Sequence, residues 1–113
     1  VMLEQAVRAA EMLKQDDCPT AVINFPWLNR VDRFWIGRNL QGFRLIATLD
    51  DHYVEFGQGQ MIAAALSQCF PSRSEILNFG VEKIPVCGQN REVLRHHGLD
   101  AESLYKKIKK ALL

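Results

Sequence analysis

The chain has 113 residues, of which 48% are hydrophobic and 24% charged, and fourteen basic side chains balance thirteen acidic ones. This length provides one hydrophobic core, so we expect a single domain over residues 1–113. The near-neutral charge gives no general reason to expect nucleic acid or an anionic membrane as a partner, and no apolar run reaches the roughly 20 residues of a membrane span. The three cysteines have no disulfide or zinc spacing, which favours a reducing, cytoplasmic setting.

Hydrophobic periodicity predicts a helix at the start of the chain and a strand after it. The first segment has apolar residues at helical spacing, and Pro19 ends it. The residues expected on its buried face are Leu3, Ala6, Val7, Ala10 and Leu13. Residues 20–25 (TAVINF) form a short apolar run, which is typical of a strand buried on both faces. A short helix is then expected from Asp32, a capping residue, to about Gly42.

The rest of the chain alternates between strand and helix patterns. Residues 43–49 (FRLIATL) and 75–81 (EILNFGV) are predicted to be further apolar strands. Between them, residues 60–70 form a predicted helix whose apolar face carries Ile62, Ala65, Leu66 and Cys69. Strands separated by helices indicate an α/β fold with three layers, in which helices cover both faces of a mostly parallel sheet.

Two more helices are predicted at the end of the chain. The first covers residues 90–97 and ends at Gly98, because glycine readily adopts the left-handed conformation of a helix end. The second begins after Asp100, which is expected to cap it. Its expected buried stripe consists of Ala101, Leu104, Ile108 and Leu112.

The polar stretch DDHYVEFGQGQ follows the second predicted strand, where open parallel sheets gather functional groups. Because neighbours in a strand point to opposite faces, at most two of Asp50, Asp51 and His52 can converge on a metal ion. We therefore expect a corner in which Asp51 and His52 are partly exposed and Asp50 binds backbone N–H groups. Gly57 and Gly59 would let the next helix start close to the sheet. The alternative is that this turn binds an anion at the free N–H groups of the helix.

Other reactive side chains have no partner that the sequence reveals. Cys87 could act as a nucleophile only beside a base, so a free structural cysteine is the simpler interpretation. His96 and His97 lie about 100° apart on a helix and cannot hold one metal ion together. The residues alone indicate an α/β domain without a complete catalytic site.

Several motifs follow one another in a defined order along the chain. They are TLDDHY with the glycines of FGQG, the strand end NFGV, the loop VEKIPVCG and the helix end GLD, preceded by EQAVRAAEML and AVINFPWLNRVD. Together they resemble the C-terminal domain of transketolase and its thiamine-diphosphate relatives. The resemblance covers essentially the whole chain. The histidine and tyrosine after the acidic pair favour the transketolase branch over the C-terminal domain of a 2-oxo acid dehydrogenase component.

The sequence departs from this family at three places. Phe56 replaces the first glycine of the turn, and Asp50 replaces the usual glutamate. In the family a central strand comes just before the first helix, and this chain begins immediately after that strand. We therefore expect a slot between residues 20–25 and 43–49, filled by upstream residues or by a strand of another chain. Direct pairing of these two segments would contradict the expectation.

The resemblance implies a non-catalytic domain or subunit that acts in assembly and dimerisation. The whole enzyme would transfer a two-carbon ketol unit between sugar phosphates. Thiamine diphosphate and magnesium would be held by the preceding domains or by a separate subunit, since their motifs do not occur here. No catalytic, cofactor-binding or metal-binding residue is then expected in this chain. The alternatives are a module that binds a phosphorylated metabolite at the Gly57/Gly59 turn, or an enzyme that uses Cys87 or His52.

Overall fold

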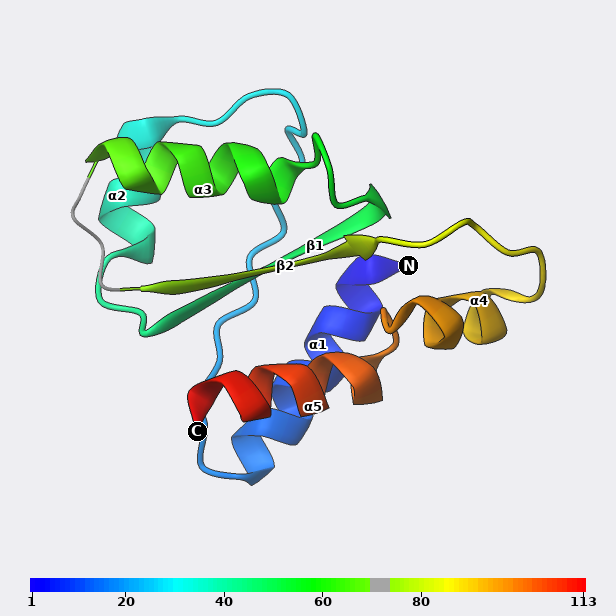
Figure 1. Cartoon of the computed structure of the whole chain (residues 1–113). Helices are drawn as coiled ribbons and strands as arrows, with labels where there is room; N and C mark the ends of the chain where they lie inside the picture. The colour runs from blue at the N-terminus through cyan, green and yellow to red at the C-terminus, as the bar shows by residue number, and fades with distance from the viewer. Residues whose placement is uncertain (70–73) are drawn as a thin grey trace.

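The computed structural model describes residues 1–69 and 74–113, and it has helices on both sides of a small sheet (Figure 1). The elements are α1 (Met2–Gln15), α2 (Arg33–Leu40), β1 (Leu45–Tyr53), α3 (Gln58–Cys69), β2 (Glu75–Val81), α4 (Asn90–His97) and α5 (Ala101–Leu112). Helices α2 and α3 lie on one side of the strands, and α1 and α5 lie on the other. The predicted three-layer α/β fold is confirmed. No helix in the described ranges is long and apolar enough to cross a membrane.

The two strands pair in parallel, as predicted. Leu45 lies opposite Glu75 and Leu49 opposite Phe79, and the pairing is irregular from there until Tyr53 meets its partner in β2. β1 is longer than predicted, because it continues through the acidic pair to Tyr53. Asp50 therefore lies within the strand and not after it.

Each face of the sheet has its own apolar cluster. Ile46 of β1 packs against Ile36 of α2 and Ile62 of α3 on one face. On the other face, Phe79 of β2 packs with residues of α1, α4 and α5, namely Ala9, Leu94, Ala101 and Leu104. Successive side chains of a strand point to opposite faces, so strands that are apolar throughout require helices on both sides.

Local capping signals predicted most of the helix ends. Asp32 accepts hydrogen bonds from two N–H groups of the first turn of α2, at 2.9 and 3.1 Å, and Gly98 ends α4 with φ 67°. The predicted cap of α5 is wrong, because the side chain of Asp100 makes no capping hydrogen bond. Ala101 N–H instead donates to Gln5 Oε1 at 2.9 Å. The packing of α1 against α5 supplies this partner from the other end of the chain.

The predicted strand at residues 20–25 is wrong. This segment has no regular structure, and residues 20–24 are exposed. A parallel strand needs a neighbour for its N–H and C=O groups, whereas here the segment and β1 both line an apolar cavity of about 560 Å³. The segment does not pair with β1, so the arrangement that would contradict a slot is absent from the described residues. What fills the slot stays a prediction.

The buried face of α1 also differs from the prediction. Leu3 and Val7 are 46% and 41% exposed. The buried residues of α1 are Gln5, Ala9 and Leu13. Of the predicted face, Leu3, Ala6, Ala10 and Leu13 line the large cavity. In α3 the predicted burial of Ile62, Ala65 and Leu66 is confirmed, and the side chain of Cys69 and Phe70 lie outside the described residues.

Candidate functional site

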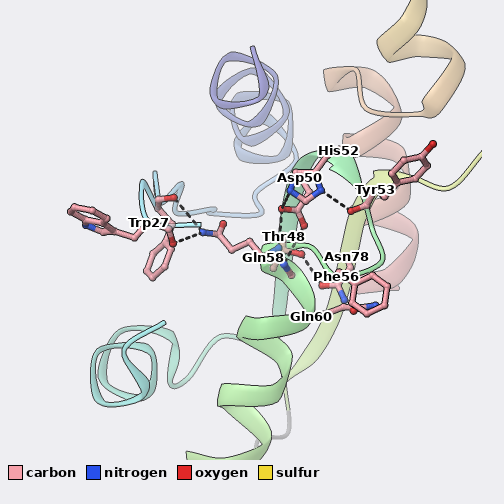
Figure 2. A network of polar contacts seen from close by, with 11 residues as sticks. Trp27, Thr48, Asp50, His52, Tyr53, Phe56, Gln58, Gln60 and Asn78 are labelled. Atoms are coloured by element: carbon pink, nitrogen blue, oxygen red, sulfur yellow. Dashed lines mark hydrogen bonds and ion pairs between the residues drawn. The ribbon is translucent and has the colours of Figure 1, made fainter. Parts of the chain in front are cut away.

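At the end of β1 a buried carboxylate binds the start of α3 (Figure 2). The side chain of Asp50 is 3% exposed. Its two oxygens accept hydrogen bonds from Gln58 N–H at 3.1 Å and Gly59 N–H at 3.2 Å. These N–H groups belong to the first turn of α3, where a negative charge is favoured by the helix dipole. The predicted bonding of Asp50 to backbone N–H groups of the turn is confirmed.

The two glycines of the turn allow this close approach. A Cβ atom at Gly57 would lie 2.5 Å from an oxygen of Asp50. A Cβ atom at Gly59 would lie 2.2 Å from Thr48 Oγ1 and 2.7 Å from Asn78 Oδ1. Thr48 itself donates a hydrogen bond of 2.7 Å to Asn78 across the two strands. The helix therefore starts directly against the sheet, which is the structural explanation that the sequence suggested for these glycines.

The other polar residues of the corner face outward. His52 is 48% exposed, its Nδ1 donates to the carbonyl of Tyr53 at 2.9 Å, and its Nε2 lies 3.6 Å from Asp50 Oδ1. Asp51 is exposed, as expected. Across residues 1–69 and 74–113, no three histidine, cysteine or acidic side chains are grouped so that they could hold a metal ion.

Phe56 keeps the turn in the conformation that glycine would adopt more easily. Its φ is 61°, and its side chain is 91% exposed. The left-handed conformation costs a non-glycine residue about 1–2 kcal/mol. The N–H of Phe56 donates to Gln60 Oε1 at 2.9 Å, which supports the turn from within α3. The departure from the family pattern at this position therefore changes the side chain but not the backbone path.

The corner also binds the irregular segment that follows α1. Gln58 Nε2 donates to the carbonyl oxygens of Phe25 and Trp27, each at 3.3 Å (Figure 2). No local pattern in the sequence predicted this contact, because its partners lie more than thirty residues apart. Gln58 thus connects the start of α3 to the wall of the large cavity.

The geometry does not favour the turn as an anion site. The N–H groups of Gln58 and Gly59 that would bind the anion already bind Asp50. An anion at this place would have to displace a buried carboxylate and would be repelled by its charge. Cys87 is exposed, and it contacts no histidine among the residues that the structure describes. Neither arrangement forms a nucleophile with its base.

These observations define the class of the molecule: an α/β domain with a parallel sheet and a helix-capping carboxylate at the end of a strand. The family described as "Transketolase, C-terminal domain" matches residues 1–104, and the chain belongs to this family. The resemblance that the sequence motifs predicted is confirmed.

Individual relatives agree with this assignment. The chain is 28% identical over 110 residues to transketolase of Mus musculus, covering 96% of this chain and 17% of that protein. It is 30% identical over 122 residues to 1-deoxy-D-xylulose-5-phosphate synthase of Psychrobacter cryohalolentis, covering 98% and 18%. A solved structure titled "Split gene transketolase, inactive beta4 tetramer" superposes with a TM-score of 0.82 at 27% identity, covering 98% of this chain and 35% of that one. The chain thus spans less than a fifth of these two curated relatives.

Proposed function

We propose that this chain is a non-catalytic domain, or a separate subunit, that serves the assembly of a transketolase-like enzyme. The observation that carries the proposal is the free edge of β1. Of the described strands, only β2 pairs with β1, and the other edge of β1 lines the apolar cavity of about 560 Å³. In the proposed assembly, an extended segment from elsewhere in the enzyme occupies this cavity as a further strand.

The backbone of β1 offers this edge in a regular pattern. Arg44 C=O accepts a hydrogen bond from Glu75 N–H, so the groups of alternate residues from position 44 onward point toward β2. The N–H and C=O groups of Leu45, Ala47 and Leu49 then point toward the cavity. A buried group without a partner costs about 1–3 kcal/mol, so a pairing strand would stabilise the domain substantially.

The walls of the cavity are residues whose sequence pattern predicts burial. They come from α1, α5 and the irregular segment, and include Leu3, Ala6, Ala10, Val22, Ile23, Leu104, Ile108 and Leu112. Several of them remain exposed in this chain, such as Leu3 at 46% and Ile23 at 45%. An apolar strand in the cavity would cover both of these side chains. The occupant is therefore an extended segment with apolar residues on both faces.

The relatives support a larger assembly around this domain. The solved structure with TM-score 0.82 is titled as a split-gene transketolase and a β4 tetramer, and the mouse relative is about six times longer than the matched region. The strand is then contributed by the preceding domains or by a separate subunit, in a homo-oligomeric enzyme. That enzyme would hold thiamine diphosphate and magnesium outside this domain and transfer two-carbon ketol units. The cytoplasmic setting stays a prediction.

The assembly proposal is tested first on the coding sequence and then on the protein. A pyrimidine-binding domain encoded just before Val1, or in the adjacent reading frame, supports the proposal. With that partner, Leu3→Glu should abolish co-purification because it places a charge in the slot. Val7→Glu is the matched control, since Val7 is 41% exposed on the same helix but does not line the cavity. Equal behaviour of the two variants would contradict the proposal.

A second experiment separates assembly from cofactor binding. Thiamine diphosphate with magnesium is titrated into the 113-residue chain by calorimetry, and no binding is expected. Saturable binding to the isolated chain would contradict a purely assembling domain.

A further inference from the structure

A second cavity, of about 260 Å³, lies beyond the carboxyl end of β2. Its walls come from the segment after β2, the last turn of α4 and the middle of α5. The charged or titratable residues that line it are Glu82, Lys83, Arg95, His96, His97 and Lys107. Ligands of open parallel sheets characteristically bind beyond the carboxyl ends of the strands. This cavity is separate from the Asp50 corner and from the slot along β1.

Three cations from three different elements face this cavity. Within the described residues, Lys83, Arg95 and Lys107 form no ion pair, although the neighbouring Lys106 pairs with Glu102 at 2.7 Å. Lys107 Nζ lies 5.6 Å from the ring centroid of Phe79, over its face, which holds the ammonium beside the sheet. With Glu82 as the one carboxylate in the lining, the cavity carries a net positive charge.

A histidine in the same cavity lacks hydrogen-bond partners. Both ring nitrogens of His97 are buried, and neither has a partner in the structure. Its ring meets that of His96 edge to face, with centroids 4.9 Å apart. An imidazole carries at least one N–H donor in every protonation state, and a buried donor without an acceptor is unfavourable. A ligand with several acceptor oxygens would satisfy it.

The helix dipole explains only part of this arrangement. Arg95, His96 and His97 lie in the last turn of α4, where positive charge is favourable without any ligand. That effect does not account for Lys83 and Lys107, which belong to other elements and line the same cavity.

We propose that this cavity binds a phosphate group, either as free inorganic phosphate or as a phosphate monoester. Arginine can bind two phosphate oxygens at once, lysine supplies point charges, and His97 supplies a neutral or charged N–H donor. The volume is below the 300–1,000 Å³ that is common for pockets holding drug-sized ligands, so it suits a phosphate head group. The proposal goes beyond assembly and does not depend on the slot.

The test is a titration of the 113-residue chain, observed through the ring protons of its three histidines by NMR. Inorganic phosphate and glucose 6-phosphate are added at constant ionic strength, with glucose and sodium chloride as controls. We expect saturable shifts of His96 and His97 and none of His52, which lies at the other corner. Saturation by both phosphates indicates a monoester site, and saturation by inorganic phosphate alone narrows the ligand to the free ion.

Charge-removing variants test which residues bind the phosphate. Lys83→Gln and Lys107→Gln should each weaken binding about tenfold, the effect of losing one charge-assisted contact. Lys110→Gln removes the same charge from α5 outside the cavity and should change the affinity less than twofold or so. All three lysines are exposed, and the dispersion of the amide spectrum confirms that each variant folds. Equal weakening by Lys110→Gln, or the same shifts with sodium chloride alone, would overturn the proposal.

Discussion

Replacing Gly59 by alanine tests whether direct contact between α3 and the sheet holds the corner together. An alanine Cβ would lie 2.2 Å from Thr48 Oγ1 and 2.7 Å from Asn78 Oδ1, two atoms that share a hydrogen bond of 2.7 Å. Either α3 must move away from the strands or this hydrogen bond must break. Overpacking costs about 1–3 kcal/mol and a lost hydrogen bond about 1 kcal/mol, so the free energy of unfolding should fall by about 2–4 kcal/mol.

Two further variants isolate the cause. Gly88→Ala is the matched control, because its Cβ would meet nothing closer than Glu92 Oε2 at 3.3 Å. Its free energy of unfolding should stay within about 0.5 kcal/mol of the parent. Thr48→Ala removes the atom nearest to the new Cβ. The double variant of Thr48 and Gly59 should therefore be about 1 kcal/mol more stable than the sum of the single effects predicts.

The measurement is urea unfolding followed by far-ultraviolet circular dichroism, with free energies compared at unchanged slope of the denaturant dependence. If Gly59→Ala loses no more stability than Gly88→Ala, the close approach does not stabilise the corner. Strict additivity of Thr48→Ala and Gly59→Ala would show that the predicted clash does not occur.

Three other predictions concern single side chains. Asp50→Ala leaves two N–H groups of α3 without their acceptor and should lower the free energy of unfolding by about 1–3 kcal/mol, whereas exposed Asp51→Ala should stay within about 0.5 kcal/mol; equal losses would contradict the capping geometry. Phe56→Gly should raise the urea midpoint, by up to about 1 kcal/mol in free energy, because φ is 61° and the ring is exposed; a lower midpoint would show that the ring packs. The hydrogen bond from Lys109 lowers the pKa of Asp16 from its ordinary 3.8 and raises that of Lys109 above 10.5. The stabilisation is therefore complete above pH 3.8 and is lost as the pH falls through the folded value, and at the alkaline end it is lost as the pH rises through the raised value. Asp16→Asn should thus be less stable than the parent between about pH 5 and 9, with the difference closing on both sides; a constant difference would refute this linkage.

Local patterns in the sequence determined the helices, the parallel pairing and much of the corner. Asp32 and Gly98 mark helix ends through contacts within a few residues, so the sequence shows them directly. The spacing from Asp50 to Gly59 is also short, and the carboxylate reaches the first turn of the next helix as predicted. The motif order that identified the family depends on the same short segments.

The tertiary structure decided what depends on neighbours far away in the chain. Residues 20–25 have the composition of a strand, but a strand forms only where another backbone completes its hydrogen bonds, and β1 lies across a cavity. Gln5 caps α5 because two helices at opposite ends of the chain pack together, and no local pattern contains that contact. Lys83 and Lys107 face one cavity for the same reason: the fold brings together elements that lie 24 positions apart in the sequence.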